Sequence, residues 1–148
     1  MQRADVTEKI LSAKRLRKLS WQTIVAEIGG GSAVYVTAGL LGQMKLRPEQ
    51  AERAAALFGL DEEETLLLQE VPYRGSLPTA VPTDPLIYRF YELVSVYGTT
   101  WKELIQEEFG DGIMSAIDFD MVIERQPDQK GDRVKITLSG KFLSYKEY

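Results

Sequence analysis

The amino-acid sequence predicts an α+β protein that is mainly α-helical, and three observations support this. Apolar residues recur at helical spacing through residues 1–70. Residues 71–84, VPYRGSLPTAVPTD, are rich in proline and glycine and separate this half from the rest of the chain. Near the end, two short stretches alternate apolar and polar residues, as strands do. We therefore predict two domains, residues 1–75 and residues 76–148.

Capping residues and apolar spacing predict five helices in the first domain. Ser20, Ser32 and Asp61 are suited to cap helix N-termini, and Pro48 is suited to a first helical position. The second and third helices, joined by three glycines, have the proportions of a helix-turn-helix. The predicted helices cover residues 6–18, 21–28, 32–42, 48–59 and 61–70.

The charge distribution does not favour nucleic acid as a partner of this helix-turn-helix. The chain has a formal net charge of −4, whereas binding to phosphate backbones relies on clustered Lys and Arg. The helix that would enter a DNA groove contains no Lys or Arg, and its polar side chains are only Ser32, Thr37 and Gln43. We therefore expect this domain to serve packing or assembly.

The sequence contains neither cysteine nor histidine. Disulfides and thiolate nucleophiles are thereby excluded, and the commonest general base and metal ligand are also lost. Carboxylates, hydroxyls, Lys, Arg and backbone amides remain for any chemistry. The first residues lack the apolar core of a signal peptide, and no apolar run is long enough to span a membrane. We expect a cytoplasmic protein without a membrane partner.

The second domain is predicted to contain two helices and two strands. Asp84 followed by Pro85 begins the first helix, which we expect to end at Gly98. Thr100 and Glu103 match a capping box for a second helix that ends before Gly110. Strands are predicted at residues 121–125 and 133–139, and the segment 110–117 could be a turn into a short helix or a strand.

This domain has too little sheet to form an independent core. About 65 residues of such composition bury a small fraction of their surface. We therefore expect the protein to form oligomers in which protomers share elements.

Three residues of the second domain are candidates for chemistry. Arg89 and Glu92 are three positions apart on one helix, so their side chains are neighbours. A surface ion pair is the simplest interpretation, but four aromatic residues flank the pair and favour a cleft or an interface: Tyr88, Phe90, Tyr91 and Tyr97.

Ser115 follows two glycines and has apolar neighbours. It could be a small packing residue bonded to a nearby carbonyl. Alternatively, its hydroxyl beside backbone N–H groups could contact an anion. It is poorly placed as a nucleophile, because the chain has no His and no Lys nearby in sequence to activate it.

Several motifs together resemble the cyanase family: PTDP, YRFYE, VYGTTWKELIQEEFGDGIMSAIDF and, upstream, VTAGLLGQMKL. The resemblance covers most of the chain. In that family the catalytic groups are an Arg and a Glu of the RFYE motif and a Ser of the glycine-flanked GDGI(I/M)SAI segment. These positions correspond to Arg89, Glu92 and Ser115 in this sequence.

The resemblance implies a bicarbonate-dependent decomposition of cyanate to carbon dioxide and carbamate, which then yields ammonia and a second carbon dioxide. It implies no metal and no organic cofactor, with bicarbonate as co-substrate. It also implies a helix-turn-helix-type domain that does not bind DNA, an intertwined C-terminal dimer and a decamer of five dimers. The alternative is a non-enzymatic oligomeric helix-turn-helix regulator that binds a small anion.

Overall fold

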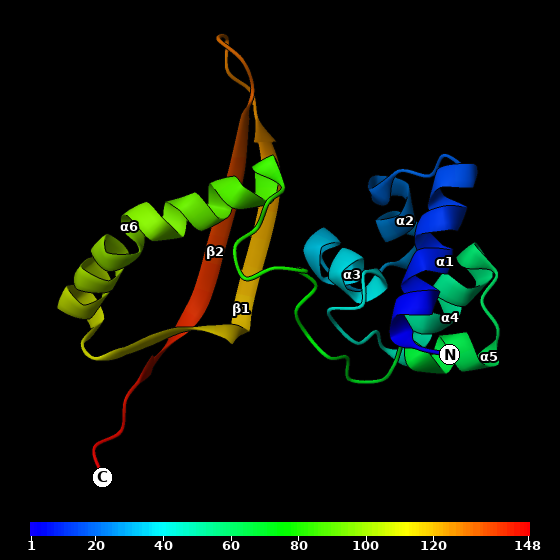
Figure 1. Cartoon of the computed structure of the whole chain (residues 1–148), viewed down its shortest axis with the longest axis horizontal. Coiled ribbons are helices and arrows are strands. Elements are labelled where there is room, and N and C mark those ends of the chain that lie inside the picture. Colours follow the sequence, from blue (N-terminus) through cyan, green and yellow to red (C-terminus); the bar gives the residue numbers. More distant parts are fainter. The chain divides into compact units, whose positions relative to one another are not determined.

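The computed structural model describes residues 1–148 and divides into two compact units, Met1–Ser76 and Leu77–Tyr148 (Figure 1). The first unit contains five helices, and the second contains one long helix and a two-stranded sheet. Helices therefore predominate over strands, and the predicted fold class is confirmed.

The five helices of the first unit correspond to the five predicted ones, with ends that differ by a few residues. Three of them begin at the predicted caps: the side chains of Ser20, Ser32 and Asp61 accept hydrogen bonds from backbone N–H groups at 3.0, 3.1 and 2.9 Å. The helices are α1 (Arg3–Leu16), α2 (Trp21–Ile28), α3 (Ala33–Leu40), α4 (Pro48–Phe58) and α5 (Glu62–Leu67).

Helices α2 and α3 meet at 96° across a short glycine-containing turn. Gly29 and Gly30 have φ angles of 64° and 73°, which residues with a Cβ rarely adopt. Helix α4 fixes the turn, because the Gln50 Nε2 atom donates to the Gly29 carbonyl at 3.0 Å and Arg53 donates to the Ile28 carbonyl at 2.8 Å. The pair is thus held rigidly in the bundle.

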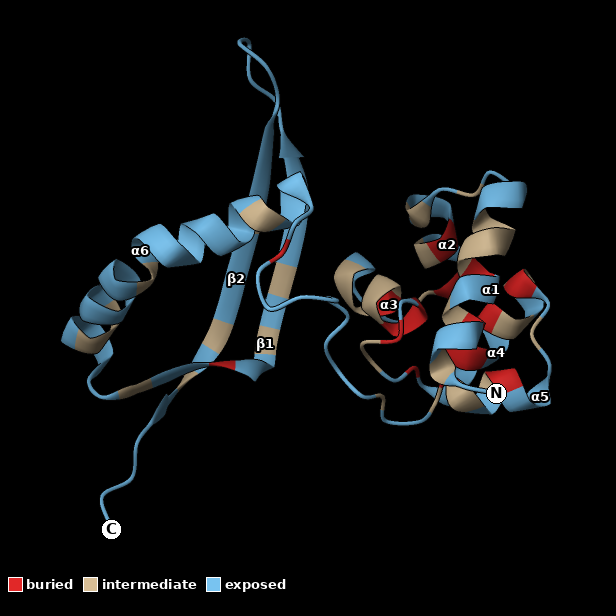
Figure 2. Ribbon diagram, in the orientation of Figure 1, coloured by how far each residue is buried: buried red, intermediate tan, exposed pale blue.

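Apart from Pro82, the buried apolar side chains of the protein lie in this first unit (Figure 2). They form one core to which all of α1, α2, α3 and α4 contribute: Val6, Ile10, Ile24, Ile28, Val36, Leu40, Leu46, Ala51, Ala54, Phe58 and Leu68. Gly39 allows α3 to approach Leu46 closely, because a Cβ on Gly39 would lie only 2.3 Å from the Leu46 Cδ2 atom. The bundle therefore has a specific packing requirement at this position.

We expect Gly39→Ala to destabilise the bundle by about 1–3 kcal/mol through overpacking against Leu46. Leu46→Ala alone should cost about 2–5 kcal/mol by leaving a cavity. In the double variant the new methyl group has room. The destabilisation measured for the double variant should therefore be clearly smaller than the sum of the two single destabilisations. Denaturant unfolding of the three variants measures this, and strict additivity would show that Gly39 is not constrained by Leu46.

The second unit begins with α6 (Pro85–Phe109), a single helix of 25 residues. Its predicted N-cap is confirmed, because the Asp84 side chain accepts from the N–H groups of Leu86 and Ile87, both at 3.0 Å. The predicted division into two helices at Gly98 is wrong. One glycine costs a helix only about 1 kcal/mol, and no proline follows to block continuation, so the hydrogen-bonded helix runs through it.

The sheet is an antiparallel hairpin of β1 (Gly112–Gln126) and β2 (Arg133–Ser144). Both strands are longer than predicted, and the segment left open between turn and strand is the start of β1. An irregularity interrupts the pairing: Met114 pairs with Phe142 and Phe119 pairs with Gly140, so residues 115–118 of β1 bulge opposite one residue of β2. Ser115 lies in this bulge.

The second unit has almost no core (Figure 2). No residue of α6 is buried, and most of its large apolar side chains are 40–68% exposed. The hairpin also has one apolar face, in which Met121 pairs with Leu138 and Ile123 pairs with Ile136.

No single helix in the structure is long and apolar enough to cross a membrane. Helices α2 and α3, taken together as a bent pair, meet the length and composition of a membrane span on those two criteria alone.

Candidate active site

Arg89 and Glu92 lie in the first half of α6 and form a loose ion pair. The distance from Arg89 Nη1 to Glu92 Oε2 is 4.0 Å, and the two side chains are 64% and 53% exposed. The guanidinium carbon also lies 5.9 Å from the centre of the Tyr88 ring, which orients the cation over an aromatic face. Because the carboxylate occupies at most one edge of the guanidinium, most donors of Arg89 are free for a ligand.

Ser115 is the one buried polar residue of the second unit, at 4% exposure. Its Oγ atom accepts hydrogen bonds from the backbone N–H groups of Ile117 and Asp118, both at 3.0 Å. Its burial agrees with a small packing residue, but its hydrogen bonds come from backbone N–H groups, and none runs from the hydroxyl to a carbonyl. The serine instead closes a tight turn within the bulge, a motif in which its side chain replaces a backbone acceptor.

This arrangement restricts what the Ser115 hydroxyl can do. A hydroxyl group has two acceptor lone pairs and one donor hydrogen, and here both acceptor positions are occupied by N–H groups. The remaining hydrogen can be donated to an acceptor such as an anion oxygen. Two N–H donors also withdraw electron density from the oxygen, so the geometry suits donation better than nucleophilic attack.

Gly140 is a residue of this site that the sequence reasoning missed. A Cβ on Gly140 would lie 2.3 Å from the carbonyl oxygen of Ser115 and 2.6 Å from the Met114 Cγ atom. The bulge can therefore fold against β2 only if position 140 has no side chain. The signal was present in the sequence, because a glycine inside an alternating strand indicates a bulge or a close backbone approach.

The structure brings Arg89 and Glu92 together but not Ser115 with them. The hydrogen bonds of the Ser115 side chain are made within its own bulge, and neither they nor an ion pair link it to α6. No three carboxylates of the chain gather as ligands for a metal ion. A helical bundle is thus followed by a long exposed helix that carries a loosely paired cation and by a bulged hairpin that carries a buried hydroxyl, which defines the chain as a small α+β protein of two units.

Comparison with known proteins places the chain in a family. Residues 3–72 match the model described as "Cyanate hydratase, N-terminal", and residues 79–147 match the "Cyanate lyase C-terminal domain". The cyanate hydratases of Polynucleobacter asymbioticus and Polaromonas sp. are 64% and 62% identical to this chain, over the full length of both proteins. The crystal structure of cyanase from T. urticae is similar with a TM-score of 0.77 and 36% identity, and the similarity covers 94% of this chain and 96% of that one. The chain belongs to the cyanate hydratase family of enzymes, as the sequence motifs predict.

We expect Gly140→Ala to displace the bulge and break the hydrogen bonds to the Ser115 oxygen. Amide exchange in residues 115–119 should then become at least about tenfold faster, since each lost hydrogen bond contributes on the order of 1 kcal/mol. Hydrogen–deuterium exchange with mass spectrometry measures this. Ser139→Ala, at the adjacent exposed position of β2, serves as the control; equal exchange in the two variants would contradict the positioning role of Gly140.

Proposed function

We propose that this protein catalyses the bicarbonate-dependent decomposition of cyanate. Cyanate, bicarbonate and one proton give carbamate and carbon dioxide, and the carbamate then takes up a proton and yields ammonia and a second carbon dioxide. The observation that carries the proposal is the full-length similarity to cyanate hydratases, combined with the presence of Arg89, Glu92 and Ser115 in the motifs expected for them.

The main obstacle to this reaction is the repulsion between two small anions. A permanently charged guanidinium lowers that repulsion, and its planar fork matches the shape of a carboxylate-like anion such as bicarbonate. We assign this role to Arg89, whose donors are mostly free. Holding both anions near one cation also converts an encounter in solution into a reaction between neighbours.

The proposed roles of Ser115 and Glu92 follow from their hydrogen-bonding capacity. Ser115 donates its one available hydrogen to an anion oxygen and so stabilises charge that develops during the reaction. Glu92 has one of two roles: it orients Arg89 through their ion pair, or it assists proton transfer to the nitrogen derived from cyanate. Both roles are compatible with its position 4.0 Å from the guanidinium.

The site is proposed to form where several protomers meet. One Arg beside one Glu is locally neutral, which is little positive charge for two anions, and Ser115 is not linked to either residue within the chain. The exposed apolar surface of α6 supports association of copies through this unit. We propose an intertwined dimer and a decamer of five dimers, located in the cytoplasm, with bicarbonate as co-substrate and with neither a metal ion nor an organic cofactor.

Ammonia release from cyanate tests the proposed activity. We expect release with added bicarbonate, much less in bicarbonate-free buffer, and no change after dialysis against a chelator. A well-folded oligomer that releases no ammonia under any of these conditions would overturn the proposal. Salt-sensitive retention on DNA would then favour the helix-turn-helix regulator, although nothing in the structure or the comparisons favours that function.

Arg89→Ala should lower turnover by at least about a hundredfold, because one preorganised electrostatic contact to reacting charge has an effect of about that size. Arg89→Lys keeps the charge but loses the planar fork, so only part of the activity should return. Arg15→Ala, an exposed position on α1, is the matched control. Native mass spectrometry should show unchanged assembly in all three variants, and near-normal turnover of Arg89→Ala would contradict the assignment.

A further inference from the structure

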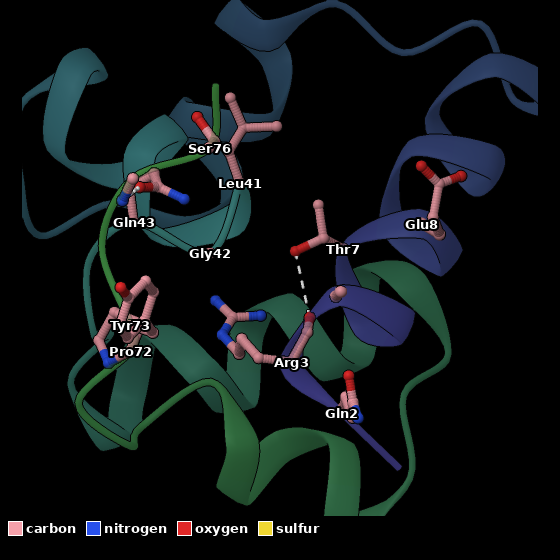
Figure 3. A pocket seen from close by; sticks show the side chains of 12 residues that line it. Gln2, Arg3, Thr7, Glu8, Leu41, Gly42, Gln43, Pro72, Tyr73 and Ser76 are labelled. Atoms are coloured by element: carbon pink, nitrogen blue, oxygen red, sulfur yellow. Dashed lines mark hydrogen bonds between the residues drawn. The ribbon is translucent and has the colours of Figure 1, made fainter. Parts of the chain in front are cut away.

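The first unit contains a cavity of about 410 Å³ that is separate from the residues assigned to catalysis (Figure 3). Its lining comes from the beginning of α1, from the chain that follows α3, and from the segment after α5, all within Met1–Ser76. Arg3, the first residue of α1, is part of this lining. In Figure 3 the Arg3 guanidinium points into the space between Thr7 and Tyr73.

The Arg3 guanidinium lacks the partners that a buried cation requires. Its Nη2 atom donates to the carbonyl of Gly39, but its Nε and Nη1 atoms are buried and have no hydrogen-bond acceptor. None of the ion pairs in the structure involves Arg3. The one acidic residue in the cavity lining, Glu8, directs its carboxylate away from the guanidinium (Figure 3).

This situation is unfavourable for a charged side chain. Buried polar groups are nearly always hydrogen-bonded, and a buried charge without a counter-ion is strongly destabilising. Burial accordingly lowers the pKa of Arg3 below its ordinary value, although an arginine remains protonated at neutral pH. The position at the N-terminus of a 14-residue helix adds a partial positive charge from the backbone.

We infer that this cavity binds a small carboxylate, whose oxygens pair with Arg3. The cavity is larger than an ion of three or four atoms, so it also has room for the carbon skeleton of an organic acid. The rest of the lining suits such a molecule, because Leu41, Pro72 and Tyr73 provide apolar surface and Gln43 and Ser76 provide polar groups.

Binding requires a small opening of the cavity wall, because Nε and Nη1 are covered in the structure. The segment after α5 can provide it. That segment has no regular secondary structure, and its backbone is attached to the bundle by a hydrogen bond from the Gly75 N–H to the Gln43 side chain at 2.8 Å. An outward shift of residues 72–76 is the opening that the inference requires.

Calorimetric titration of the assembled full-length protein with malonate tests the inference. All samples carry Arg89→Ala, so that binding at the proposed active site does not contribute, and sodium chloride of equal ionic strength replaces malonate in the blank. We expect saturable binding that Arg15→Gln leaves unchanged and that Arg3→Gln weakens at least about tenfold, because a charge-assisted hydrogen bond has about that effect.

A second variant keeps the test decisive if Arg3→Gln does not fold. Ser76→Trp fills the cavity from an exposed wall position and leaves Arg3 in place, so it should also weaken malonate binding at least about tenfold. Absence of saturable binding in the Arg89→Ala protein would overturn the inference. Binding that survives both Arg3→Gln and Ser76→Trp would equally overturn it, because the ligand would then occupy another place.

Discussion

The uncovered apolar surface of the second unit is the constraint on which the rest of the structure depends. Helix α6 has apolar side chains on much of its circumference but buries none of them. The hairpin adds a second apolar face, and a stack of Phe109 on Phe142, with ring centres 5.2 Å apart, is its one aromatic contact with the helix. A helix that is apolar over so much of its surface is stable when it is covered, and in this protein the candidate for covering it is another copy.

The same covering determines what the site can do. Two unit charges 4 Å apart interact by about 1 kcal/mol in water and by about 4 kcal/mol at the effective dielectric of a partly buried protein site. In a single chain the pair of Arg89 and Glu92, at 4.0 Å, is exposed. Its interaction energy is therefore close to the smaller value, the one for water. Association through α6 would remove water from this pair and strengthen every contact of Arg89 with an anion. In the proposed function, oligomerisation and catalysis would therefore both depend on this one exposed helix.

The sequence predicted what local chemistry determines. Caps such as Ser20 and Asp84 have a direct physical cause in their side-chain oxygens, and the structure has them in place. The predicted end of the helix at Gly98 failed, because the penalty for one glycine is smaller than the cost of breaking a helix. The bulge and the double acceptor role of Ser115 depend on the register in which β1 pairs with β2, which no local pattern specifies. Gly140 could have been found by asking why a strand contains a glycine.

The two units thus have different physical characters. The helical bundle has a complete core and fixed turns, whereas the second unit carries the proposed catalytic residues and has almost no core. The central claim is that one site combines Arg89 and Ser115 from different protomers.

Mixing the Arg89→Ala and Ser115→Ala variants tests that claim most directly. The two inactive proteins are unfolded together and refolded, and ammonia release from cyanate is then measured. Random assembly with residues from different protomers restores about a quarter of the sites, so we predict activity near one quarter of the wild-type value. Activity no higher than that of each variant refolded alone, from oligomers of normal mass, would contradict the account.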